Sequence, residues 1–304
     1  MLSVFNPLND KYRKMNDLRP NENYTTSAIR PGEFDHYPEK PVGEYLTDVV
    51  SNEWVNDEYK LLCLSVPEKA LSAYAGQFFH LLCPSPDGAE VWMRRPMSVY
   101  RVNSPAGQIE FLYKCEGRGT RGMGMLESGD TFNISGPLGI GFALDPAWKN
   151  IVVLGRGVGL ATLAPLSQLA AEKGVGVTAI LSARKSELLM SQDLFRELGA
   201  ETFSVVDEDG SSDVDNVEKI LERLIFSGKA DAFFTCGSSR LLNLMQTLGK
   251  KHSVPGQVAM EQIMVCGFGA CYVCMRTFQV DGERVLRRVC REGPVFKIQE
   301  AVGW

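Results

Sequence analysis

Residues 150–174 have the sequence NIVVLGRGVGLATLAPLSQLAAEKG, in which an apolar run leads into a glycine-containing turn and then into an amphipathic segment. The run IVVL is typical of a buried strand, and the segment after the turn has the period of a helix. Strand-like and helix-like segments continue to alternate downstream, with the second helix expected over residues 186–200. Because such alternation is typical of a parallel sheet, we predict a doubly wound α/β domain over residues 148–258.

The turn in this stretch contains three glycines at alternate positions, Gly155, Gly157 and Gly159. A glycine-lined turn at a helix N-terminus lets backbone amides approach a pyrophosphate, so the turn is a candidate dinucleotide site. It is not a complete GxGxxG fingerprint, and a plain strand-to-helix connection is the alternative. Arg156 either pairs with phosphate or fills the space that a dinucleotide needs. Cys236 and Gly237 end another strand at the same edge of the sheet, where ligands of such folds bind.

Upstream of this domain, residues 41–147 contain short apolar or β-branched runs, separated by Pro, Gly, Asn and Asp. This rhythm is typical of a small antiparallel β-barrel or sandwich. Residues 1–40 are rich in Pro, Asn and charge without a sustained period, which indicates an extension rather than a domain. Residues 259–304 follow the α/β domain as a small, cysteine-bearing module.

Two segments of the predicted barrel have the composition of an anion site. The first, RRPMSVYRV (94–102), places three arginines in a predicted strand. Buried cations are costly unless they are paired, and a forked guanidinium suits a phosphate; an exposed strand edge is the alternative. The second, YKCEGRGTRGMG (113–124), contains four glycines whose amides, together with the Thr120 hydroxyl, suit an anion. Two loops that face one anion would suit a flavin dinucleotide.

Four of the eight cysteines lie close together near the C-terminus: Cys266, Cys271, Cys274 and Cys290. Their intervals of four, two and fifteen residues follow the plant-type iron–sulfur spacing, C-x4-C-x2-C and a distant Cys. Gly267 and Gly269 supply the backbone freedom that one loop needs to wrap a cluster. Structural zinc is the main alternative, but such sites usually have a C-x-x-C in each half. The pattern therefore predicts a [2Fe-2S] cluster.

The composition, 44% hydrophobic and 23% charged, is that of a globular protein. A formal net charge of −5 without a basic run argues against a nucleic-acid partner. No apolar run is long enough to span a bilayer, and the charged N-terminus leaves no place for a signal-peptide core, so we expect no membrane association and a cytoplasmic protein. Neither a Ser-His-Asp arrangement nor a paired-carboxylate motif stands out, which disfavours hydrolysis.

Several segments carry a family resemblance when they are taken in order. They are RPMS (95–98), LYK (112–114), GT (119–120), SGPLGIGF (135–142), LGRGVGLATLAPL (154–166), CGSSRLL (236–242), and MEQIMVCGFGACYVC with VCREGPVF (260–274 and 289–296). From residue 41 to the C-terminus the chain resembles the electron-transfer subunits of class 1B dihydroorotate dehydrogenase, a branch of the ferredoxin-NADP reductase superfamily. The resemblance implies an oxidoreductase subunit that passes electrons between NAD(H), FAD and a [2Fe-2S] cluster. Its partner would be a separate FMN-containing catalytic subunit, in a hetero-oligomer.

Carried over by position, the resemblance also implies roles for individual residues. The implied flavin contacts are Arg95, Pro96, Met97, Ser98, Leu112, Tyr113, Lys114, Gly119 and Thr120. Among these, Arg95 would contact a phosphate and Ser98 would lie near the reactive edge of the flavin. The implied pyridine-nucleotide contacts are Gly155, Gly157, Gly159, Cys236 and Gly237. The four clustered cysteines would ligate the cluster, with Glu261 as a supporting group on the preceding loop.

The chain departs from the family pattern in the nucleotide domain. Arg156 stands within what is usually a run of glycines, and the usual Ala-Pro of the helix start is delayed to Ala164-Pro165. The loop DEDGSSDVDN (207–216) lacks the glycines that normally follow its first residues. These departures favour an alternative hypothesis, an electron-relay or docking subunit whose NAD site no longer functions. A zinc-stabilised interaction module without redox function is a third hypothesis.

Overall fold

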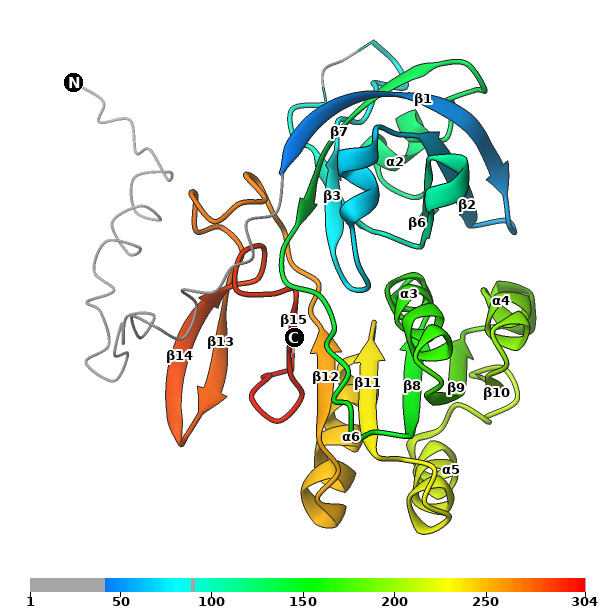
Figure 1. Ribbon diagram of the computed structural model, residues 1–304, viewed down its shortest axis with the longest axis vertical. Coiled ribbons are helices and arrows are strands. Elements are labelled where there is room, and N and C mark those ends of the chain that lie inside the picture. Colours follow the sequence, from blue (N-terminus) through cyan, green and yellow to red (C-terminus); the bar gives the residue numbers. More distant parts are fainter. Residues whose placement is uncertain (1–41, 89–90, 304) are drawn as a thin grey trace, which may run out of the picture.

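The computed structural model describes residues 42–88 and 91–303, so the predicted extension over residues 1–40 lies outside the described part of the chain. Figure 1 shows an antiparallel barrel at the top, a sheet with its helices below it, and a hairpin with long loops at the side. This arrangement confirms the predicted fold class of a β-barrel, a doubly wound sheet and a small C-terminal module. No helix in the described ranges is long and apolar enough to cross a membrane.

The barrel is built from β1 (Gly43–Trp54), β2 (Tyr59–Ser65), β3 (Phe78–Leu81), β4 (Arg95–Ser98), β5 (Arg101–Asn103), β6 (Gln108–Lys114) and β7 (Thr131–Leu138), and a short helix, α2 (Arg118–Met123), follows β6. Within the described residues these strands form one seven-stranded sheet in the order β4-β3-β7-β1-β2-β6-β5. Alternate side chains along each strand point inward, as a half-buried sheet requires. Phe79, Phe111 and Ile134 are thereby fully buried in the barrel core.

The second sheet is built from β8 (Asn150–Arg156), β9 (Gly176–Ala183), β10 (Glu201–Val206), β11 (Ala232–Cys236), β12 (Gly256–Ala259) and β15 (Val295–Lys297). In the described part of the chain its order is β10-β9-β8-β11-β12-β15, and the pairs from β10 to β12 are parallel. The order reverses between β8 and β11, which creates a crevice at the carboxyl ends of these strands. β15 pairs antiparallel with β12, so the C-terminal module supplies an edge strand of this sheet.

The helices of this domain are α3 (Gly159–Glu172), α4 (Gln192–Glu197), α5 (Val214–Phe226) and α6 (Ser239–His252). α3 and α4 pack into one hydrophobic core with barrel residues, whereas α5 and α6 pack into a second core on the other face of the sheet. The helix predicted over residues 186–200 is shorter than expected. It consists of a 3-10 turn (Ser186–Leu188) and α4, because Ser191, with φ of 63°, interrupts the helical backbone.

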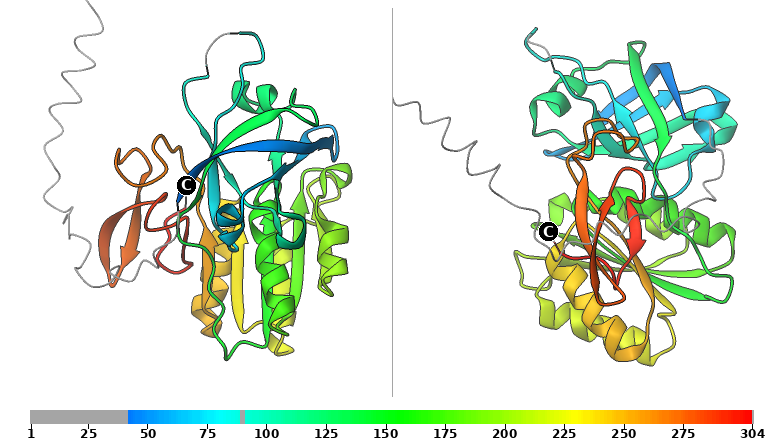
Figure 2. Two further views of the ribbon diagram at one scale, coloured as in Figure 1. Left: turned by 45° about the horizontal axis from the view of Figure 1, so that its top comes forward. Right: turned by 90° about the vertical axis from the view of Figure 1, so that its left-hand side faces the viewer.

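The C-terminal module consists of a loop over residues 260–274, the hairpin of β13 (Met275–Val280) and β14 (Glu283–Arg288), and the segment that returns to β15. Cys274, Phe278 and Cys290 are buried in the core that also contains α5 and α6. Figure 2 shows the loop, drawn in orange, rising from the sheet along the side of the barrel. The module therefore touches both larger parts of the molecule.

Candidate redox site

A cavity of about 800 Å³ lies where the barrel, α3 and the loop before the cysteines meet. Five residues of the predicted flavin site line it: Arg95, Pro96, Met97, Ser98 and Leu112. The opposite wall comes from Ala161 and Thr162 of α3 and from Met260–Met264. A largely apolar wall with a few polar groups, at this volume, is typical of a cofactor site.

The three arginines of the predicted strand have different partners. Arg94 forms an ion pair with Glu44 at 2.6 Å, and Arg101 forms one with Glu110 at 2.9 Å. Arg95 has no carboxylate within ion-pair distance among the described residues, although it lines the cavity. Arg95 is therefore the arginine of this segment that is available for a phosphate.

Gly119 lies beside this guanidinium. A Cβ atom at Gly119 would be 3.1 Å from Nε of Arg95, so the absence of a side chain lets the start of α2 approach the arginine. The Thr120 hydroxyl, in contrast, accepts hydrogen bonds from the amides of Gly117 at 3.0 Å and Glu116 at 3.1 Å. The structure thus brings Gly119 to Arg95 and uses the Thr120 side chain to hold the turn in shape.

The side chains of Leu112, Tyr113 and Lys114 lie in three different environments. Leu112 lines the cavity, but the Tyr113 ring is fully buried in the barrel core, where its hydroxyl donates to Oδ1 of Asn52 at 2.9 Å. Tyr113 therefore does not line the flavin cavity as predicted, because successive side chains of a strand point to opposite faces. Lys114 lines a second pocket and forms an ion pair with Glu116 at 2.6 Å.

Three polar side chains from separate segments line the cavity: Ser98, Thr162 and Glu261. Thr162 Oγ1 donates to Ser98 Oγ at 2.9 Å. Cys236 Sγ lies 4.0 Å from Oε1 of Glu261. Burial raises the pKa of the Cys236 thiol and that of the Glu261 carboxyl. Burial thus favours the protonated form of the Glu261 carboxyl at the wall of the cavity.

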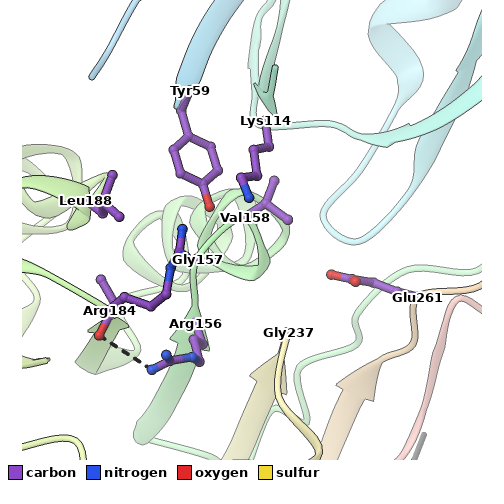
Figure 3. A pocket seen from close by; sticks show the side chains of 10 residues that line it. Tyr59, Lys114, Arg156, Gly157, Val158, Arg184, Leu188, Gly237 and Glu261 are labelled. Atoms are coloured by element: carbon purple, nitrogen blue, oxygen red, sulfur yellow. Dashed lines mark hydrogen bonds between the residues drawn. The ribbon is translucent and has the colours of Figure 1, made fainter. Parts of the chain in front are cut away.

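The second pocket, of about 230 Å³, opens at the carboxyl edge of the parallel sheet (Figure 3). Lys114, Gly157 and Gly237 line it, as do Arg156 and Glu261. Gly157 has φ of 55°, a conformation that favours glycine. Glu261 also lines the larger cavity, so the two sites are contiguous.

Gly155 and Gly159 serve the packing of α3 rather than the wall of this pocket. A Cβ atom at Gly159 would lie 2.5 Å from the carbonyl oxygen of Cys236, and one at Gly155 would lie 2.7 Å from the Leu160 side chain. Glycine at both positions therefore lets the N-terminus of α3 approach β8 and β11. This close packing brings the helix start to the second pocket.

The Arg156 guanidinium is held at the edge of the sheet by neighbouring strands. It donates to Ser182 Oγ at 3.0 Å and to the carbonyl oxygen of Ala183 at 3.4 Å, the latter drawn as a dashed line in Figure 3. It also forms an ion pair with Asp207 at 2.6 Å. Arg156 is thus a wall residue with partners of its own, and the pocket lies open beside it.

The four clustered cysteines stand in two pairs. The sulfur atoms of Cys274 and Cys290 are 3.2 Å apart and buried, whereas Cys266 and Cys271 lie in the more exposed part of the loop. Within the described residues no group of three Cys, His, Asp or Glu side chains is arranged to hold one metal ion. Two pairs fit a two-iron cluster, which takes two protein ligands on each iron, better than a single tetrahedral zinc.

Backbone amides donate to these sulfur atoms. The amide of Ala270 donates to Cys266 at 3.3 Å, and that of Cys290 donates to Cys274 at 3.4 Å. Burial raises the pKa of Cys266, but hydrogen bonds headed by that of the Cys271 backbone outweigh burial and bring the pKa to about 7. The Cys290 thiol lowers the pKa of Cys274 to about 6. Both shifts favour the thiolate form that iron binds, whereas the same contact with Cys274 raises the pKa of Cys290.

The shape of the cysteine loop depends on two glycines and a buried ion pair. Gly267 and Gly269 have φ of 80° and 88°, and a Cβ atom at Gly267 would lie 2.9 Å from the His80 ring. Arg288 donates from Nη1 to the carbonyl oxygen of Gly269 at 2.9 Å and from Nε to Glu292 at 3.0 Å. The donor atoms, the amides and the glycine backbone therefore fit an iron–sulfur cluster.

Three residues at these sites were assigned no role from the sequence. His80 is a single histidine in an apolar strand, yet its ring packs against the cysteine loop. Thr162 follows Ala161 where the family has Ala-Pro, and Asp207 begins the altered loop. For the last two residues, departure from the family pattern was the only available signal. For His80 there was none.

Family models match two parts of the chain. A model described as an oxidoreductase FAD-binding domain matches residues 47–141, which lie in the barrel. A model described as the iron-sulfur cluster binding domain of dihydroorotate dehydrogenase B matches residues 261–302, which include the cysteine loop. Both matches agree with the cavity and the paired cysteines described above.

Curated relatives match most of the chain. The dihydroorotate dehydrogenase B (NAD(+)) electron transfer subunit of Desulforamulus reducens is 31% identical over 236 residues, which cover 78% of this chain and 89% of that protein. The subunit of the same name from Enterococcus faecalis is 32% identical over 232 residues, covering 75% of this chain and 86% of that protein. These alignments exceed the length of any one domain.

Solved structures share the arrangement of the domains. One is the structure of an NADH-dependent reduced ferredoxin-NADP oxidoreductase, studied for flavin-based electron bifurcation. It has a TM-score of 0.72 and 26% identity, and the match covers 86% of this chain and 91% of that chain. The ferredoxin reductase in carbazole 1,9a-dioxygenase has a TM-score of 0.57 at 19% identity, covers 70% of this chain and 67% of that chain, and supports the fold alone.

Proposed function

Because the chain belongs to the family of dihydroorotate dehydrogenase B electron transfer subunits, we propose that it moves electrons between NAD(H) and a separate catalytic subunit. The observation that carries this proposal is the continuity of the sites. Glu261 lines both the nucleotide pocket and the flavin-sized cavity, and the Met260–Met264 segment of the cavity wall leads directly to Cys266. One continuous segment of chain therefore joins the wall of the cavity to the cysteine loop.

In this proposal each part of the chain has one task. Residues 41–147 bind FAD, residues 148–258 bind NAD(H), and residues 259–304 hold the [2Fe-2S] cluster. Bound flavin supplies the exchange between two-electron hydride chemistry and the single electrons that a cluster carries. The residues of β4 and α3 that line the cavity would hold the flavin, and the buried Glu261 carboxyl would keep a proton beside it.

The partner is proposed to be an FMN-containing, dihydroorotate-dehydrogenase-like subunit in a cytoplasmic hetero-oligomer. Support comes from the apolar surface around the cysteine loop, where four side chains are between 41% and 60% exposed: Val265, Phe268, Tyr272 and Val273. Exposed apolar side chains that gather at one place are typical of an interaction surface. A partner that covers this surface would receive electrons next to the cluster.

The visible spectrum of the purified protein, with metal, sulfide and flavin analysis, tests the cofactors. We expect flavin together with about two irons per chain, as a [2Fe-2S] cluster requires. Anaerobic mixing with NADH then tests the function and should bleach the flavin absorbance. Flavin and iron without bleaching by NADH or NADPH would favour the relay subunit with a non-functional NAD site. Colourless protein with about one zinc per chain would favour the interaction module.

Arg95→Ala should weaken FAD binding roughly tenfold or more, since a charge-assisted contact to phosphate is lost. Arg95→Lys should give an intermediate loss, because it keeps the charge but not the forked geometry. Flavin content after dialysis and the dissociation constant of re-added FAD are the measurements. Arg101→Gln combined with Glu110→Gln is the matched control, because it removes both charges of an ion pair in the same segment whose residues do not line the cavity. Equal FAD retention in all variants would contradict the phosphate role of Arg95.

A further inference from the structure

His80 lies on β3 with its imidazole ring buried between the barrel and the cysteine loop. The residue is 1% exposed. A Cβ atom added to Gly267 would meet Cε1 of this ring at 2.9 Å and both ring nitrogens at 3.0 Å. Gly267 follows Cys266 directly in the sequence. The part of the imidazole that contains its nitrogens is therefore packed against the loop, beside one of the cluster cysteines.

One nitrogen of this ring has no hydrogen bond. Nε2 of His80 is buried, and no residue in the described part of the chain donates to it or accepts from it. Buried polar atoms in proteins are nearly always paired, so an unpaired one calls for a partner such as a bound group. Since the ring contacts the cysteine loop, the group that this loop holds is the candidate partner.

The same strand also contacts the flavin cavity. Phe78 and His80 are two residues apart in β3, so their side chains lie on the same face of the strand. Their ring centroids are 5.8 Å apart, and Phe78 lines the flavin cavity. One face of β3 therefore contacts the cavity with one ring and the cysteine loop with the next.

The imidazole is neutral and can act as a hydrogen-bond donor. Burial, with a smaller effect of the Arg94 guanidinium, lowers the pKa of His80 to about 4. A neutral imidazole has one N–H donor and one acceptor nitrogen. Cysteine sulfurs that ligate iron are thiolates, which accept hydrogen bonds, as Cys266 and Cys274 already do from backbone amides. Such acceptors favour the tautomer with the proton on Nε2.

We propose that Nε2–H of His80 donates a hydrogen bond to a sulfur atom of the [2Fe-2S] site, so that a side chain of the flavin-binding barrel helps to set the reduction potential of the cluster. The inference rests on the cluster that the proposed function assigns to the cysteine loop. Reduction adds a negative charge to the cluster, so a donor to sulfur stabilises the reduced form more than the oxidised form. His80 thus raises the reduction potential without being a ligand of iron.

The test is a redox titration, monitored by EPR, of the intact protein with its cofactors. His80→Leu removes the donor and keeps a side chain of similar size. The ratio of reduced to oxidised cluster at a fixed potential should fall about tenfold, which lowers the potential of a one-electron couple by about 59 mV. His80→Gln has an amide N–H that can replace Nε2–H, so it should keep most of the wild-type potential.

The second histidine of the described ranges provides the control. His252 is on α6, where its ring packs edge-on against Phe226. Its Nε2 also lacks a hydrogen bond among the described residues, and it lies 3.7 Å from Oε1 of Glu222. His252→Leu should therefore leave the potential of the cluster unchanged. An equal shift in this variant would point to a general effect of losing a buried imidazole and would overturn the proposal.

Pulsed EPR of the reduced protein, prepared with ¹⁵N-labelled histidine, tests the contact without a substitution. Wild-type protein should show a weak coupling between the cluster and one histidine nitrogen, and His80→Leu should lose it. The absence of any coupling in wild-type protein would overturn the proposal. A strong coupling would also overturn it, because the imidazole would then be a ligand of iron.

The outcomes also separate this inference from the proposed function. If NADH bleaches the wild-type flavin but His80→Leu keeps the wild-type potential, the inference is wrong and the proposed function stands. If the cluster shows the histidine coupling but neither NADH nor NADPH bleaches the flavin, the inference stands and the proposed function is wrong. Protein that contains zinc in place of iron would overturn both.

Discussion

A Cys274→Ala variant is expected to retain its flavin and lose its iron. Cys274 is 1% exposed and its sulfur lies 3.2 Å from that of Cys290, so its removal breaks the buried pair of ligands. Alanine fits within the space of the cysteine and introduces no unpaired polar atom. The flavin cavity is lined by other residues, Met264 being the last before the cysteine loop. Iron and sulfide content and the visible spectrum are the measurements.

A cysteine outside the cluster provides the control for this experiment. Cys115 lies in the barrel, where its thiol donates to the carbonyl oxygen of Thr120 at 3.5 Å. Cys115→Ser can keep this hydrogen bond and should leave iron, sulfide and flavin at wild-type levels. Wild-type iron content in Cys274→Ala would refute the ligand assignment. Loss of iron and flavin together would instead indicate general unfolding, which circular dichroism would detect.

The fold and the cysteine site were predictable because each depends on short-range patterns. The strand period of the barrel and the alternation of strands and helices after Asn150 reflect which side chains must be buried in each element. The spacing of the four cysteines reflects how far one loop must reach around a cluster. Such constraints act between residues that are near one another in the sequence, so they can be recognised without a structure.

The contacts between segments distant in sequence were not predictable in this way. Arg156 and Asp207 were two unrelated departures from a pattern until the sheet brought the ends of β8 and β10 to the same edge. Thr162 contacts Ser98 because α3 packs against β4 across the domain boundary. Tyr113 was misplaced because a family motif gives the identity of a residue but not which face of its strand it occupies.

Glu292→Gln is expected to lower the stability of the C-terminal module and to accelerate loss of the cluster. The side chains of Arg288 and Glu292 are only 10% and 3% exposed, and they form a buried ion pair. Removing one charge of such a pair costs about 3–5 kcal/mol, because the Arg288 guanidinium then stays buried without the neutralising carboxylate. The measurements are the apparent melting temperature of the protein and the half-life of the cluster absorbance at a fixed temperature.

The combination Arg288→Met with Glu292→Leu separates stability from the positioning of the loop. Replacing both charges of a buried pair by apolar side chains is often neutral or stabilising, so the melting temperature should return toward the wild-type value. The cluster should still be lost faster, because the bond of 2.9 Å from Arg288 to the carbonyl oxygen of Gly269 is absent.

The neighbouring ion pair of Arg287 and Glu300 provides the control. It bridges β14 and the C-terminal segment at 2.8 Å, and among residues 42–88 and 91–303 neither side chain forms a hydrogen bond to the cysteine loop. Glu300→Gln should therefore lower the melting temperature. Its cluster should nevertheless have a longer half-life than the cluster of the double variant. If the double variant recovers both the melting temperature and the cluster half-life, Arg288 acts through stability alone. If only the melting temperature recovers, Arg288 positions the loop that holds the cluster.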